Sequence, residues 1–81
     1  SENPLSNTEI MIYPNPVKSS FKLNINSNNI IIYTINGKKV KEFSGKFSIN
    51  KNFNVEDLKK GFYLLEVKNN KGKTYKKLLI E

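Results

Sequence analysis

Short apolar runs with strand character, separated by turn signals, restrict the fold of this chain more than any other feature. Residues 20–26 alternate strictly, with Phe21, Leu23 and Ile25 on one side and polar residues on the other, which is the pattern of a half-buried strand. We expect further strands over residues 10–13, 30–35, 38–43, 62–69 and 74–80, and one or two short, irregular strands within residues 47–55. Residues 56–61 suit only a single helical turn or a tight loop. About seven short strands therefore predict an all-β chain that forms an antiparallel sandwich or barrel.

The strongest turn signal is Asn36-Gly37, which follows the run IIIYTI at residues 30–35. That run is apolar on both faces and rich in β-branched residues, as expected of a central strand. An Asn-Gly pair favours a type I′ turn, because this turn needs positive φ at both central positions. We therefore predict a hairpin with a type I′ turn between residues 30–35 and residues 38–43.

The stretch MIYPNPV, residues 11–17, breaks the first strand unusually hard. Pro14 and Pro16 have no N–H group to donate to a strand ladder, so the strand must stop there or lie at a sheet edge. Each proline also favours an extended conformation of the residue before it, Tyr13 or Asn15. The sequence therefore predicts a stiff, extended exit from the first strand.

The residue types present exclude most catalytic chemistry. The 81 residues include no histidine and no cysteine, so a histidine-based triad, a disulfide and a zinc site of the usual ligands are ruled out. Glu56 and Asp57 are the only adjacent carboxylates, and a chain that forms one small domain has little room for a walled cleft. We expect no enzyme activity, no metal and no cofactor.

The net charge of +7 comes from 14 lysines without any arginine. These lysines are spread along the sequence, which is typical of a solvated outer surface. Four tyrosines interleaved with lysines leave open a single-stranded nucleic-acid-binding β-barrel, because such proteins stack bases on aromatic side chains in a basic groove. A glycan-binding or adhesive sandwich module is a third alternative, and it requires an exposed aromatic platform.

The sequence also allows expectations about membrane spans and about the start of the chain. The longest apolar run, Ile30 to Tyr33, is far too short to span a bilayer. The chain opens without methionine and without a basic-then-apolar leader, so we expect a fragment of a longer protein. Residues 1–9 are polar and carry no periodicity, and we read them as the remnant of a linker.

Four motifs, taken in order, carry a family resemblance. They are YPNPV near the start, IIIYTINGKKV, NVEDLKKGFYLLEV, and GKTYKKLLIE at the end. In this order and spacing, residues 10–81 resemble the C-terminal sorting domain, type A, of the type IX secretion system. Two departures stand out: Leu58-Lys59-Lys60-Gly61 occupies the place of the usual Leu-Pro-Ala-Gly, and the link between Ile25 and Ile30 is short.

The resemblance implies a function as well as a fold. Members of this family are seven-stranded, immunoglobulin-like β-sandwiches at the C-terminus of exported proteins. They direct an N-terminal cargo domain from the periplasm through the outer-membrane translocon to the cell surface or the medium. A sortase-like cysteine protease then usually removes the domain. By this resemblance we expect translocon components and that protease as partners, and no nucleic acid.

The resemblance also marks candidate recognition residues. For each of them, a role in folding alone is the alternative explanation. The candidates are Tyr13, Pro14, Asn15, Pro16, Gly37, Gly61, Tyr63, Lys76, Lys77, Leu78, Leu79 and Ile80. The family's signal lies toward its extreme C-terminus, and a terminal edge strand is readable by strand addition. Residues 76–80 are therefore the first choice for direct recognition, with an ordinary amphipathic last strand as the alternative.

Overall fold

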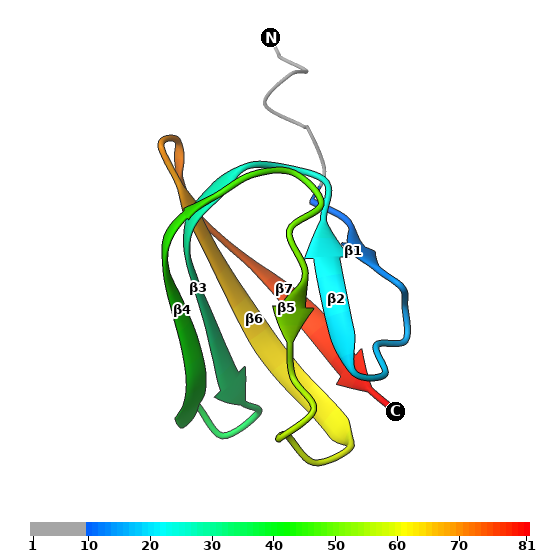
Figure 1. Ribbon diagram of the computed structural model, residues 1–81. Helices are drawn as coiled ribbons and strands as arrows, with labels where there is room; N and C mark the ends of the chain where they lie inside the picture. The colour runs from blue at the N-terminus through cyan, green and yellow to red at the C-terminus, as the bar shows by residue number, and fades with distance from the viewer. Residues whose placement is uncertain (1–9) are drawn as a thin grey trace, which may run out of the picture.

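Seven strands form two antiparallel sheets in the computed structural model, which describes residues 10–81. The three-stranded sheet has the order β1 (Ile12–Tyr13), β2 (Ser20–Leu23) and β5 (Phe53–Asn54). The four-stranded sheet has the order β4 (Lys39–Phe47), β3 (Ser27–Thr34), β6 (Gly61–Asn69) and β7 (Gly72–Ile80). Figure 1 shows the smaller sheet packed across one face of the larger one. This confirms the predicted all-β, antiparallel sandwich.

The path of the chain between the sheets resembles that of an immunoglobulin-like sandwich. The chain crosses from one sheet to the other after β2, after β4 and after β5 (Figure 1). The fourth strand pairs with β3 instead of joining the smaller sheet, where constant-type immunoglobulin domains place it. As a result β6 lies between β3 and β7, and the last strand is at the edge of its sheet.

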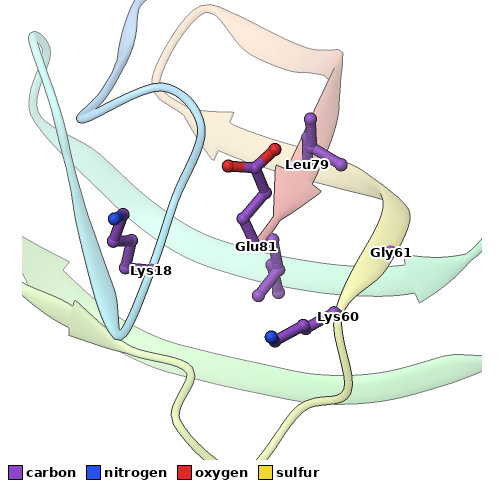
Figure 2. Close-up of a pocket in the computed structure, with 6 residues that line it drawn as sticks. Lys18, Lys60, Gly61, Leu79 and Glu81 are labelled. Atoms are coloured by element: carbon purple, nitrogen blue, oxygen red, sulfur yellow. The ribbon is translucent and has the colours of Figure 1, made fainter.

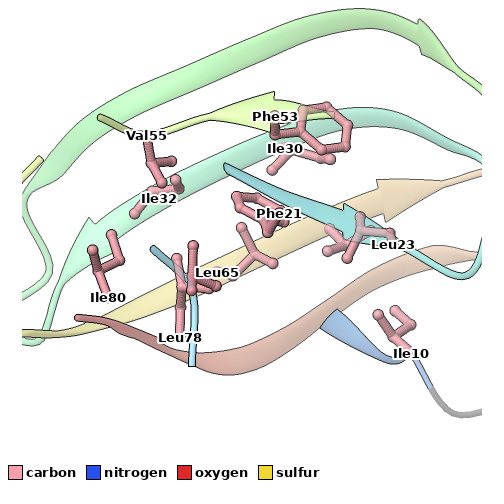
Figure 3. Close-up of a cluster of buried hydrophobic side chains, with 12 residues drawn as sticks. Ile10, Phe21, Leu23, Ile30, Ile32, Phe53, Val55, Leu65, Leu78 and Ile80 are labelled. Atoms are coloured by element: carbon pink, nitrogen blue, oxygen red, sulfur yellow. The ribbon is translucent and has the colours of Figure 1, made fainter. Parts of the chain in front are cut away.

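The core fills the space between the two sheets and is dominated by phenylalanine. Phe21 and Phe53 stack with their ring centroids 5.2 Å apart, and Phe43 and Phe47 each meet Phe53 edge-on at 5.1 Å. Such offset and edge-to-face contacts are the favourable arrangements for aromatic rings. The buried core residues, most of them labelled in Figure 3, are Ile10, Val17, Phe21, Leu23, Ile30, Ile32, Phe53, Val55, Leu65, Val67, Leu78 and Ile80. The predicted inward face of residues 20–26 is thus confirmed, and Leu65 and Val67 show that the strand expected over residues 62–69 also has a buried face.

Two irregular segments differ in detail from their expected form. Residues 47–55 contain one complete strand, the two-residue β5, and Phe47 is the last residue of β4. Residues 56–60 form a tight turn, in which Leu58 N–H donates to Val55 O at 3.0 Å. Residues 10–81 include no helix long and apolar enough to cross a membrane.

The β3–β4 hairpin forms as predicted, but the prediction of a type I′ turn was wrong. Gly37 has a φ of 93°, whereas Asn36 is not among the described residues with positive φ. Gly37 N–H donates to Thr34 O at 2.9 Å, and Thr34 N–H donates to Lys38 O at 2.8 Å. These bonds define a three-residue hairpin loop, residues 35–37, which ends in a glycine with positive φ. In such loops the glycine forms a bulge, and the bulge matches the loop to the right-handed twist of the two strands. The β3–β4 register accordingly shifts between Ile32 and Tyr33.

A side-chain ion pair ties the turn before β6 to β4. Lys41 Nζ lies 2.9 and 3.1 Å from the two carboxylate oxygens of Asp57, and it also lies 5.6 Å from the ring centroid of Phe43. The hydrogen bond from Lys41 holds the pKa of Asp57 below its ordinary value. The pair therefore favours the folded state wherever Asp57 is ionised.

We expect this pair to make stability fall in acid. Because the folded pKa of Asp57 is below the unfolded one, its contribution is present above the unfolded value of about 4 and is lost as the pH drops through the folded value. Asp57→Asn should therefore lower the melting temperature at pH 7 and have no such effect at pH 2. Glu56→Gln, which removes the neighbouring exposed carboxylate, is the control in a thermal melt followed by circular dichroism. An equal effect of Asp57→Asn at both pH values would contradict this account.

Candidate functional site

Val17 joins the end of the broken first segment to the last strand. After Pro14 and Pro16, Val17 forms a parallel bridge with Ile80. Its N–H donates to Leu79 O at 2.9 Å, and its carbonyl accepts from Glu81 N–H at 2.7 Å. The Val17 side chain is fully buried. The motif YPNPV therefore stops one strand and then holds the carboxyl end of β7.

Gly61 and Tyr63 support the same end of β7 from its other side. On β6, Gly61 lies opposite Ile80 and Tyr63 lies opposite Leu78. Gly61 has a φ of 144°, which residues with a side chain rarely adopt, although no atom lies within 4 Å of where a Cβ would be. Tyr63 is half-buried, and its hydroxyl donates to Lys59 O at 2.6 Å. Both residues thus shape the strand against which β7 ends.

A hollow of about 650 Å³ opens at this end of the molecule (Figure 2). Lys18, Lys60 and Glu81 supply its charged side chains, and the hollow is completed by Gly61, Leu79 and Ile80. Two ammonium groups and one carboxylate around an open space form a polar surface that a partner protein can contact. We call this end of the fold, made of Val17, Lys18, Lys60, Gly61 and residues 76–81, the carboxyl edge.

Side chains near the end of β7 alternate between the core and the outer surface. Leu78 and Ile80 point into the core, with 1% and 3% of their surfaces exposed (Figure 3). Lys77 is exposed, and Lys76 and Leu79 are half-buried. A smaller hollow of about 200 Å³ lies beside Lys76, Lys77 and Leu78 and is also lined by Ile10, Met11, Ile12 and Asn15. Leu78 and Ile80 therefore position the edge, while Lys77 presents its ammonium group to solvent.

The remaining candidates lie away from the carboxyl edge. Tyr13 pairs with Lys22 on β2, and its hydroxyl donates to Asn50 Oδ1 in the loop after β4. Gly37 lies in the β3–β4 turn, and β3 and β6 separate β4 from β7 in the sheet. The structure thus brings Asn15, Gly61, Tyr63 and residues 76–80 together and leaves Gly37 apart.

The sequence patterns missed three residues of the carboxyl edge that carry charge, and one that is buried. Lys18, Lys60 and Glu81 line the hollow, but nothing distinguished them from the other charged residues along the chain. Val17 had one available signal, since it is a lone apolar residue directly after the second proline. Its parallel partner lies at the far end of the chain, so no local period reveals it.

We expect Val17→Ala to destabilise the domain and loosen the carboxyl edge. Removing two buried methyl groups and leaving a cavity should lower the free energy of unfolding by about 2 kcal/mol. Val40→Ala is the matched control, because Val40 is 37% exposed on β4 and loses the same atoms. Urea unfolding measures the stability, and amide hydrogen exchange at Glu81 measures the edge. If the two variants were equally stable and Glu81 exchanged alike in both, Val17 would not have the role assigned to it.

Comparison with known proteins gives one match. A family model described as "secretion system C-terminal sorting domain" matches residues 11–81. No curated protein matches this sequence. The matched range includes YPNPV, Gly37, Gly61 and the whole of β7.

Proposed function

This chain belongs to the family of C-terminal sorting domains of the type IX secretion system, and we propose that the translocon recognises its folded carboxyl edge. The general function follows from the family. The domain is a sorting signal that sends an N-terminal cargo through the outer membrane to the cell surface or the extracellular space. This family is not an enzyme family. The sorting role is favoured over a nucleic-acid-binding barrel and over a glycan-binding module.

The observation that carries the proposal is the convergence of distant motifs on the carboxyl edge. Val17 and Gly61 lie 44 positions apart in sequence, the difference between 61 and 17, yet both meet Ile80. Lys18, Lys60 and Glu81 then surround an open hollow at the same place. A surface assembled this way exists only after folding, so its recognition would select a folded domain.

Strand addition is the mode of recognition that we propose. Alternate residues of a strand direct their N–H and C=O groups to the same side. Leu79 O and Glu81 N–H point away from β6 toward Val17, so the corresponding groups of Lys73, Tyr75 and Lys77 face the same way. Val17 bonds only to the end of this edge, at Leu79 and Glu81. An extended segment of a translocon component would pair with the preceding part of β7, at Lys73, Tyr75 and Lys77.

The other candidates have supporting roles in this proposal. Pro14 and Pro16 end β1 and deliver Val17 to β7, while Gly37 and Tyr63 maintain the hairpin and the turn before β6. The sortase-like protease remains a proposed partner, acting on the chain before β1. The linker expected over residues 1–9 lies outside the described residues and stays a prediction.

We expect Lys77→Pro to block secretion while the domain stays folded. Proline removes the outward N–H of Lys77 and leaves the ladder to β6 in place, as edge prolines do in native sheets. The secreted fraction of a fused reporter should fall at least about fivefold, equivalent to roughly 1 kcal/mol of binding free energy. Melting temperature checks the fold of the purified domain.

Lys77→Gln is the matched control, because it removes the charge and keeps the N–H. Normal secretion of Lys77→Gln together with failure of Lys77→Pro supports strand addition. An equal loss in both variants would place recognition in the ammonium group. Normal secretion of a folded Lys77→Pro variant would contradict recognition at this edge.

A further inference from the structure

The outer face of the four-stranded sheet is unexpectedly apolar. Phe62, Leu64 and Tyr75 are 57%, 38% and 52% exposed. Cross-strand pairing places Phe62 beside Leu79, and Leu64 beside Tyr33. The outward face of an antiparallel sheet is commonly polar, and a contiguous exposed apolar patch marks an interaction site. We call this surface the outer apolar face; its residues are Ile31, Tyr33, Phe62, Leu64, Tyr75 and Leu79.

Lysines surround the outer apolar face. The same strand registers put Lys39, Lys68, Lys73 and Lys77 on this side of the sheet. All four are exposed. Their ammonium groups are long enough to reach around the rings while their aliphatic stems extend the apolar area.

The carboxylates on this side are already engaged within the chain. Glu42 accepts a hydrogen bond from Lys39 Nζ at 2.9 Å. Glu66 is only 5% exposed; it accepts from the Tyr33 hydroxyl at 3.0 Å and lies 3.9 Å from Lys73 Nζ. The hydrogen bond from the Tyr33 hydroxyl to Glu66 raises the pKa of Tyr33. Four lysines against these two acids, which pair with Lys39 and Lys73, still leave the face with a net positive charge beside its rings.

We propose that the outer apolar face docks on an anionic membrane surface, with Phe62 and Tyr75 among the headgroups and the lysines against lipid phosphates. Tyr75 has a ring with one polar end, which suits the membrane–water interface, and Phe62 buries apolar surface there. Lysines near an anionic surface are attracted to it. A protein partner fits less well, because protein interfaces are depleted in lysine. A second copy of the chain would bring these lysines against their own counterparts, and like charges repel.

This inference goes beyond the sorting function and rests on different chemical groups, although Lys77 and Leu79 belong to both surfaces. Strand addition uses backbone groups at the free side of β7, whereas membrane docking uses side chains that project from β6 and β7 at right angles to that side. A domain docked by this face would keep the carboxyl edge accessible in the membrane plane. Binding to lipid is measurable without any translocon, so the two proposals fail separately.

A tryptophan probe tests the docking directly, because the chain contains no tryptophan of its own. Phe62→Trp reports on the outer apolar face, and Ile49→Trp is the control, since Ile49 is 51% exposed in the loop after β4. Each full chain is mixed with vesicles of phosphatidylcholine alone or of phosphatidylcholine with phosphatidylglycerol. We expect a blue shift of emission only for Phe62→Trp and only with the anionic vesicles. No shift at low salt, or an equal shift for Ile49→Trp, would overturn the proposal.

Vesicle flotation with a second pair of variants separates docking from general charge attraction. Phe62→Ser combined with Tyr75→Ser should weaken binding to anionic vesicles by about tenfold or more. Ile49→Ser should leave binding unchanged. Undiminished binding of the double variant would overturn the proposal. A double variant that binds vesicles normally but is secreted poorly would assign the face to a protein partner and would also overturn it.

Discussion

The parallel contact between Val17 and Ile80 is the constraint on which the carboxyl edge of this domain depends. It buries two apolar side chains and satisfies backbone groups of Leu79 and Glu81 that would otherwise face solvent at the end of the last strand. On the opposite side of β7, Gly61 on β6 completes the enclosure. The end of β7 is therefore anchored in the core through Ile80, so a sorting signal located there depends on the fold.

Much of the sandwich could be predicted because its strands obey simple alternation. Phe21 and Leu23 point inward, as do Leu65 and Val67, and the hydrophobic effect fixes both faces once the period is known. The turn at Gly37 was assigned wrongly because the type of turn depends on loop length, and loop length depends on a register shift that no local sequence pattern reveals. β5 has only two residues because the packing of Phe53 against other rings, and not a strand period, determines its place.

The candidate recognition residues were predictable by position but not by arrangement. The motifs located Asn15, Gly61, Tyr63 and residues 76–80 along the chain, whereas their meeting at one edge depends on a parallel contact between the two ends of the domain. The strand alternation at the C-terminus then changes the interpretation of the motif. Leu78 and Ile80 are buried, so what a partner meets is the backbone of β7, the ammonium group of Lys77 and the hollow around Glu81. Lysine residues that looked evenly scattered in the sequence also separate in space, and four of them surround the outer apolar face.

The same strand, β7, contributes to both surfaces for a geometric reason. Its even-numbered residues Leu78 and Ile80 face the core, its odd-numbered residues Tyr75 and Lys77 face outward, and its backbone groups are open along one side. One edge strand thus offers a partner hydrogen-bonding groups in the sheet plane and side chains perpendicular to it. Because one strand contributes to both, a domain with a small core can present the carboxyl edge and the outer apolar face.

A secretion assay with a fused reporter is the decisive test of the sorting role. Residues 1–81 would be placed behind a periplasmic reporter, in cells with a working type IX system and in a matched strain that lacks the translocon. The account predicts reporter at the surface or in the medium of the first strain alone, with the sorting domain removed. Reporter retained in the periplasm of both strains, from a domain shown to be folded, would contradict it.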